Sequence, residues 1–161
     1  MLRRGFRLIG QGIRSQPRIF TAALVGSALF GAMSVASAYV LGAVTGRVIL
    51  PAFSEGRVST GALVLAAAVI LAVAILKIIG IIGRRLFAGI MQYRLQAESR
   101  RQVTRQYLRL PLSWHQQHPT GQLLSNANSD VEAAWYFVAP LPFACGALLM
   151  LVITIVSLFL T

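Results

Sequence analysis

Long uncharged apolar runs dominate the pattern of this chain. Residues 19–46, 58–76 and 133–161 carry no charged side chain. Because about 20 helical residues cross the hydrocarbon layer of a bilayer, each run predicts a transmembrane helix. The sequence therefore predicts an all-α membrane protein. We expect the spans at about 19–46, 58–83 and 137–161. Residues 84–136 would form the cytoplasmic loop region that connects the second and third spans.

The segment 1–18 has a different pattern, in which Leu2, Phe6, Ile9 and Ile13 recur at helical spacing among arginines. This pattern predicts a basic amphipathic helix that lies in the headgroup plane and ends before the first span. Three glycines in the segment leave a disordered basic arm as the alternative, because glycine destabilises a helix.

An export signal is a competing interpretation of the amino terminus. The letters RRGF at 3–6 resemble a twin-arginine signal, and Ala36-Ser37-Ala38 has the form of a cleavage site. The apolar run continues past this site through Val44, and more membrane sequence follows. A retained first span is therefore preferred.

Small residues repeat every fourth position in the first span. The stripe consists of Ser34, Ala38, Gly42 and Gly46. A face without bulky side chains lets another helix approach closely, so the stripe predicts helix packing.

The second span has a short loop before it and no clear end after it. Residues 47–59 are expected to form the loop, and Lys77 interrupts the apolar run that follows. Lys77 is either a functional intramembrane cation or, as we prefer, a side chain whose stem reaches the headgroups. No proline occurs between Gly61 and Leu110, so the helix is expected to continue to Leu110 and to extend roughly 40 Å beyond Arg84.

Charge placement excludes one class of partner and sets an orientation. The net charge is +11, with five arginines in residues 1–18 and seven in 84–109. Arginine at the ends of spans indicates a membrane protein rather than a nucleic-acid-binding one, and it places both segments in the cytoplasm. Residues 47–59 then lie outside.

The sequence offers little material for catalysis. Its only lysine, Lys77, follows the letters AVAIL, so no phosphate-binding loop ending in Gly-Lys-Ser/Thr is present. His115 and His118 could share a helix face, but no third metal ligand lies near them in sequence. Cys145 is the only cysteine and has no disulfide partner within the chain. We expect no catalytic, cofactor or metal site in this chain.

The segment from Leu110 to Ser129 is polar but carries no formal charge. Neutral amides, imidazoles and an indole are desolvated at lower cost than arginine, and tryptophan is enriched among interface anchors. The segment therefore predicts a docking surface, with an ordinary solvated loop as the alternative. The next helix begins at Thr120 or at Ser129, where Ser129 and Glu132 match a capping box. The predicted docking residues are Ser113, Trp114, His115, Gln116, Gln117, His118, Thr120 and Gly121.

The run LRLPLSWHQQHPTGQLLSNANSDVEAAW resembles the first intracellular loop of ABC exporters of the type I fold. In that family a leucine-proline pair and an aromatic residue precede Thr-Gly-x-Leu and a later Asp-Val. Asn126 departs from the arginine that many relatives carry. The matching positions in this sequence are Thr120, Gly121, Leu123, Asp130 and Val131.

The resemblance implies an amphipathic elbow helix at 1–18 and a partial exporter transmembrane domain at 19–161. Two spans would extend into the cytoplasm around a coupling helix at 113–118, and the third long helix would begin near Thr120. The chain would be the amino-terminal part of a half-transporter, and its end at Thr161 without a polar tail suggests truncation.

The function implied is ATP-driven export across the cell membrane, with ATP and magnesium bound by a nucleotide-binding domain that is absent from this chain. The partners implied are that domain, a second half-transporter in a homodimer or heterodimer, and membrane lipids. Family members move drugs, lipids, peptides or siderophores, and the sequence does not select among them. The alternative is a small three-span accessory protein without transport activity, for which the coding frame would stop after Thr161.

Overall fold

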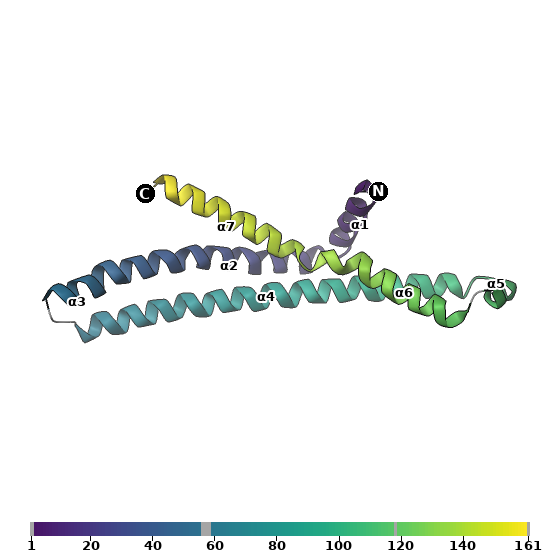
Figure 1. The fold of residues 1–161 in the computed structure, drawn as a ribbon, viewed down its shortest axis with the longest axis horizontal. Helices are drawn as coiled ribbons and strands as arrows, with labels where there is room; N and C mark the ends of the chain where they lie inside the picture. Colours follow the sequence, from purple (N-terminus) through teal and green to yellow (C-terminus); the bar gives the residue numbers. More distant parts are fainter. Residues whose placement is uncertain (1, 56–58, 118, 161) are drawn as a thin grey trace. The chain divides into compact units, whose positions relative to one another are not determined.

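The computed structural model describes residues 2–55, 59–117 and 119–160, and all elements in these ranges are helical. The predicted all-α membrane fold is confirmed, because three stretches of the described residues are long and apolar enough to cross a membrane. They are Pro17–Phe53, Thr60–Tyr107 and Gly121–Phe159. The helices are α1 (Leu2–Ser15), α2 (Pro17–Val44), α3 (Leu50–Glu55), α4 (Thr60–Tyr107), α5 (Leu112–Gln117), α6 (Thr120–Trp135) and α7 (Leu141–Leu160) (Figure 1).

The chain packs as two units, each with its own contacts. Unit 1 comprises Met1–Thr21 and Arg85–Leu141, and unit 2 comprises Ala22–Arg84 and Pro142–Thr161. Unit 1 therefore contains α1, α5, α6 and the second half of α4, whereas unit 2 contains most of α2, the first half of α4 and α7.

Helix α1 forms where the amphipathic helix was predicted, and it ends before Pro17. Pro17 then begins α2, a position that suits proline because the first helical residue needs no N–H bond. In unit 1 the side chain of Ile13 packs against a cluster formed by Met91, Leu95 and Val138. The apolar face of α1 is therefore partly occupied by protein, and its location in the headgroup plane stays a prediction.

The expected loop at 47–59 is wrong for residues 47–55, which are helical. A π-helical turn at Thr45–Ile49 joins α2 to α3, and the Leu50 N–H bonds to the Thr45 carbonyl. Proline in a helix crowds the carbonyl four residues earlier, which for Pro51 belongs to Arg47 in the π-turn. The wider turn accommodates the ring, and the helix continues. The remaining loop includes residues 56–58, which lie outside the described residues.

Helix α4 runs unbroken for 48 residues and ends at Tyr107, three residues before the expected end. Bonds from the Arg109 and Leu110 N–H groups to carbonyls three residues earlier close the last turn. At 1.5 Å per residue α4 is about 72 Å long, more than twice the ~30 Å of a bilayer's hydrocarbon layer.

The third long apolar segment is not one continuous helix. Helix α6 ends at Trp135, a 3-10 turn follows at Tyr136–Val138, and α7 begins at Leu141. Pro140 and Pro142 supply no N–H to the carbonyls of the preceding turn, so a continuous helix would lose two bonds there. The structure also gives Thr120 as the first residue of α6, which answers the alternative between Thr120 and Ser129.

The core of unit 1 is small and lies where α1, α4 and the end of α6 meet. Met91, Leu95 and Val138 are buried, and Ile13, Ile19, Phe20 and Trp135 pack around them. This cluster holds the second half of α4 against the end of α6. Since α5 connects these two helices, the cluster helps to position α5 within unit 1.

Candidate functional site

The short helix α5 packs against the end of α4 through one aromatic stack and one hydrogen bond. The ring of Trp114 stacks on Tyr107 with centroids 6.1 Å apart and an interplanar angle of 29°. Nε2 of His115 lies 3.1 Å from the Tyr107 carbonyl oxygen, which also accepts a bond from the Leu110 N–H. The last carbonyls of a helix lack partners within the helix, so His115 joins α5 to an otherwise under-bonded end of α4.

The segment from the end of α4 to the start of α5 exposes two large apolar side chains. Leu108 is 80% exposed and Leu112 is 74% exposed, although neither belongs to a predicted span. Exposed leucines beside uncharged polar side chains are typical of a surface that a partner covers. Sequence reasoning missed these leucines, whose only signal was their position on either side of Pro111. We call the surface formed by Leu108 and residues 112–117 the α5 surface.

The predicted docking residues occupy different positions. Ser113, Gln116 and Gln117 are exposed, whereas Trp114 and His115 are half-buried by their contacts with α4. His118 lies outside the described residues. Thr120 and Gly121 are the first two residues of α6, and a Cβ added at Gly121 would meet nothing within 4 Å.

Ser129 lies inside α6 and is not a cap. Its hydroxyl donates to the carbonyls of Ser125 and Asn126, at 3.1 and 3.2 Å. Serine inside a helix commonly bonds backward in this way, and the turn before it is already helical. The capping box suggested by Ser129 and Glu132 is therefore wrong.

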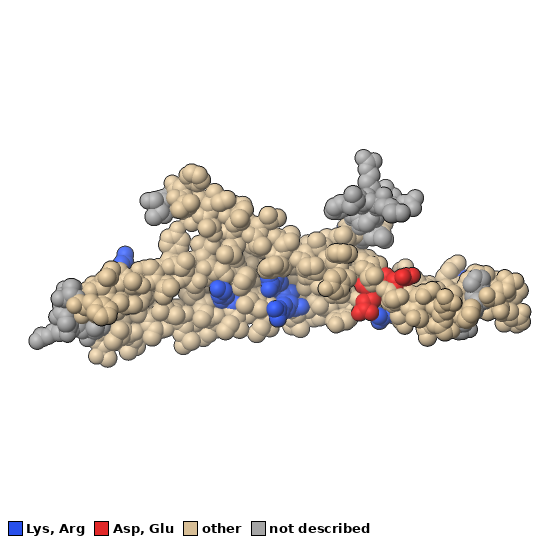
Figure 2. Space-filling view, viewed as in Figure 1, with Lys and Arg blue, Asp and Glu red and all other residues tan. Residues whose placement is uncertain are grey.

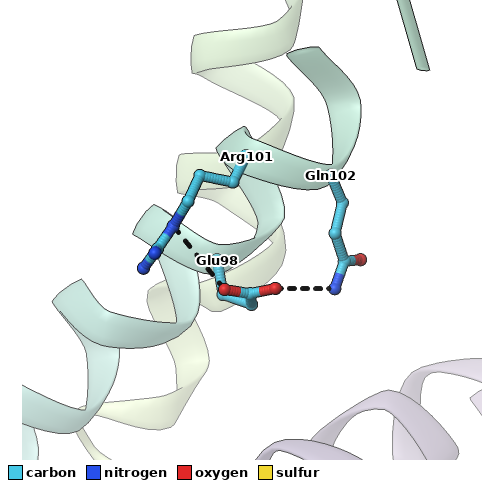
Figure 3. Close-up of polar contacts among 3 residues, drawn as sticks. All are labelled: Glu98, Arg101 and Gln102. Carbon is cyan, nitrogen blue, oxygen red and sulfur yellow. Dashed lines mark hydrogen bonds and ion pairs between the residues drawn. The ribbon is translucent and has the colours of Figure 1, made fainter. Parts of the chain in front are cut away.

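Three polar contacts involve the part of α4 that belongs to unit 1. Glu98 pairs with Arg101 on the same helix, with Nε 3.6 Å from Oε2, and accepts a 3.3 Å bond from Gln102 (Figure 3). Trp135 Nε1 donates a 2.7 Å bond to Ser99 Oγ, which joins α6 to α4. The pair on the helix surface contributes little, whereas the Trp135 bond is half-buried.

The Trp135 ring also meets α1. A Cβ built on Gly12 would lie 2.8 Å from Trp135 Cζ3 and 3.2 Å from Leu95 Cδ1. Glycine at position 12 therefore lets α1 pack directly on the indole.

In unit 2 the helices touch at glycines. A Cβ on Gly80 would lie 2.8 Å from the Phe30 nitrogen and 3.0 Å from the Gly26 carbonyl oxygen. The backbones of α2 and α4, which run side by side in Figure 1, are therefore in direct contact at this point. A Cβ on Gly146 would lie 2.7 Å from Ser27 Cβ, which brings α7 equally close to α2.

The predicted stripe of small residues makes no such approach in the structure. Ser34 is half-buried and donates to the Phe30 carbonyl, while Ala38, Gly42 and Gly46 are exposed. A Cβ added at Gly42 or Gly46 would meet nothing within 4 Å. The packing role of this stripe stays a prediction.

Two cations of α4 meet the same aromatic ring in unit 2. Lys77 Nζ lies 5.7 Å from the centroid of Phe30, and the Arg84 guanidinium carbon lies 5.2 Å from it. Arg84 is also 4.5 Å from the centroid of Phe143, so α2 and α7 each place a ring beside it. A cation over an aromatic face gains roughly 0.5–2 kcal/mol, less than the several kcal/mol that removing a charge from water costs.

No group of three or more potential metal ligands occurs among residues 2–55, 59–117 and 119–160. Cys145 is a free, exposed cysteine on α7. His115 makes the contact to α4 described above, and its predicted neighbour His118 is not described.

Comparisons with known proteins give one match. The family described as the ABC transporter transmembrane region matches residues 20–161, which is most of the chain and includes the second half of α4, α5 and α6. No curated protein and no solved structure matches. The helices, their apolar runs and this match agree: the chain is a multi-pass membrane protein that belongs to the family of ABC transporter transmembrane regions.

Proposed function

We propose that this chain is the amino-terminal membrane portion of an ATP-driven ABC exporter. Its spans would form part of the substrate pathway, and α5 would be the coupling helix that receives movement from a nucleotide-binding domain. In this proposal the amino terminus and the α5 surface are cytoplasmic, and the membrane is the cell membrane.

The observation that carries the proposal is the length of α4 together with what lies at its end. About 35 Å of this helix extends beyond Arg84, and α5 packs against its last residue, Tyr107. A helix that only crossed the bilayer would need neither this extension nor an uncharged surface with exposed leucines. A long helix that presents such a surface can transmit the movement of a domain that binds there.

The reaction itself would belong to partners. The sequence contains no Gly-Lys-Ser/Thr loop, so ATP and magnesium would be bound by the nucleotide-binding domain of the same polypeptide or of another subunit. A second half-transporter, identical or different, would complete the pathway. These partners distinguish the proposal from a three-span accessory protein, which would show no ATP-dependent transport.

The test is the coupling between transport and ATP hydrolysis in the full-length protein. We expect Trp114→Ala to depress substrate-stimulated ATPase activity while ATP binding is nearly unchanged, because the indole that holds α5 on Tyr107 is lost. Gly121→Pro should act in the same direction, because proline disfavours the helical conformation of Thr120 before it. Unchanged coupling in both variants would remove the docking role.

A milder pair of variants separates docking from folding. Gly121→Ala fills open space and should not weaken the fold, so a loss of coupling would report a partner that approaches this position. Gly89→Ala also fills open space on α4 and should leave coupling unchanged.

A further inference from the structure

We propose that a groove beside the junction of α1 and α2 binds an anionic phosphate group, which the guanidinium groups of Arg18 and Arg94 hold. This inference goes beyond the proposed function, because it concerns the start of the first span and does not involve the α5 surface. The surroundings favour a phospholipid head as the source of the phosphate, and the experiment separates it from inorganic phosphate.

The groove lies within unit 1 and has a volume of about 290 Å³. Its lining comes from the junction of α1 and α2 and from α4, and consists of Ser15, Gln16, Pro17, Arg18, Ile19 and Arg94. Two arginines from distant parts of the sequence therefore border one space. Small-molecule sites usually have volumes of about 300–1,000 Å³, so the groove suits a head group rather than a whole lipid.

No acid of the chain balances these two arginines in the part that the structure describes. Residues 1–54 and 56–97 contain no aspartate or glutamate. The acid nearest to Arg94 in the sequence is Glu98, which pairs with other side chains of α4, as described above. In Figure 2 the acidic atoms on this face gather where Figure 1 places α4 and α6. Arg18 and Arg94 form no ion pair with any described residue, so both can bind an anion from outside the chain.

The donors of the groove indicate which anion fits. The hydroxyl of Ser15 already donates to the Gly12 carbonyl at 2.7 Å, so the strongest donors that remain are the two guanidinium groups. Each guanidinium presents paired N–H groups that match two oxygens of a phosphate. A phosphate has enough oxygens for both arginines. The groove also lies at the start of α2, whose macrodipole favours an anion there.

The position of Arg18 along the chain favours a phospholipid as the source. Arg18 is the last charged residue before the uncharged run at 19–46, and the first apolar segment long enough to cross a membrane begins at Pro17. Arginine at the end of a span lies near the lipid heads, and anionic heads attract it. A phospholipid could place its head in the groove while its tails stay in the bilayer.

The first measurement uses the purified full-length protein in nanodiscs of phosphatidylcholine with a minor fraction of phosphatidylglycerol that carries a photoactivatable head. We expect labelling at residues 15–19 and on α4 near Arg94, because these residues line the groove. Phosphatidylcholine with the same reactive group should label them less, because its choline cation is repelled by two arginines. Equal labelling by the two lipids would overturn the proposal. This measurement does not depend on the folding of any variant.

Inorganic phosphate is the second probe, titrated calorimetrically into the same protein in nanodiscs of phosphatidylcholine alone. Labelling by phosphatidylglycerol without heat from phosphate would support the site with a lipid head as its ligand. Heat without labelling would support the site with a soluble phosphate as its ligand, provided that the heat depends on Arg18 and Arg94. Labelling only outside the groove together with no heat would overturn the proposal.

Variants then test the two arginines. Arg18→Gln and Arg94→Gln should each weaken binding about tenfold, the factor that corresponds to losing one hydrogen bond to a charged group. Arg94→Lys, which keeps the charge, should retain part of it. The matched controls are Arg14→Gln on α1 and Arg100→Gln on α4, which remove exposed charges outside the groove and should change binding less than twofold. Equal loss in the controls would indicate unspecific attraction to the basic surface and contradict the proposal, as would no loss in any variant.

Discussion

The contact between α2 and α4 in unit 2 gives the sharpest test of the structure. Gly80 lies so close to α2 that an added Cβ would be 2.8 Å from the Phe30 nitrogen, whereas ordinary contacts begin near 3.4 Å. In Gly80→Ala the two backbones must separate by about 0.6 Å or more, because backbone atoms cannot rotate away as a side chain can. Gly83, three residues further along α4, has nothing within 4 Å of an added Cβ.

The size of the effect follows from two opposing terms. Overpacking a tight contact costs about 1–3 kcal/mol, while replacing glycine by alanine in a helix gains up to about 1 kcal/mol. Gly80→Ala should therefore lower the free energy of unfolding by about 0–3 kcal/mol. Gly83→Ala carries only the favourable term and should be neutral or stabilising. The difference between the two variants, about 1–3 kcal/mol, is the quantity that the contact predicts.

The assay is reversible unfolding of the protein in mixed micelles, followed by far-ultraviolet circular dichroism as a denaturing detergent is added. Both variants undergo the same chemical change on the same helix, so propensity and side-chain volume cancel between them. If Gly80→Ala and Gly83→Ala unfolded at the same detergent fraction, α2 and α4 would not approach at Gly80 in the native protein.

The remaining predictions concern unit 1 and use the same unfolding measurement. Met91→Ala should lower the free energy of unfolding by about 2–5 kcal/mol, because Met91 is 1% exposed at the centre of the cluster; a loss under about 1 kcal/mol would mean that the cluster does not form. Trp135→Phe should cost about 1 kcal/mol through the lost bond to Ser99, and combining it with Ser99→Ala should add little further; fully additive losses would show that no such bond exists. Arg101→Ala should change the free energy by less than about 0.5 kcal/mol, because the side chains of the Glu98 pair are 66% and 52% exposed; a larger loss would reveal a further partner of Arg101.

Local signals predicted the helices of this chain well. Apolar runs longer than a bilayer requires, and the absence of proline between Gly61 and Leu110, were enough to predict one continuous helix, α4. Boundaries were less accurate where proline had two possible effects. Pro51 was placed in a loop, yet a π-turn admits it into a helix, whereas the apolar run that contains Pro140 and Pro142 is divided between α6 and α7 by a 3-10 turn. The effect of a proline depends on whether the preceding turn can widen, and the sequence pattern does not encode this.

The place of the short helix α5 along the chain was predicted, but the contacts that hold it were not. The family resemblance implied a coupling helix at 113–118, and the structure has a helix at Leu112–Gln117. The contact between His115 and the Tyr107 carbonyl was not foreseen, because it joins a side chain to a backbone atom eight residues away. Its role as a coupling helix stays a prediction, since no described contact includes the proposed partner.

Helix packing in unit 2 shows why some sites cannot be found by reading one helix at a time. The first span contains two sets of small residues, and the one from Ser34 to Gly46 was expected to mediate packing. The close approaches among the described residues instead use Gly26, Ser27 and Gly31, and the buried residues Ala23, Ser27 and Gly31 repeat every four positions just as the expected stripe does. These residues mediate the close approaches because Gly80 and Gly146 lie opposite them, and a close approach requires small residues on both helices. At the exposed end of the stripe a Cβ added to Gly42 or Gly46 would meet nothing within 4 Å, so a segment that packs there should itself present glycine, alanine or serine at the point of contact.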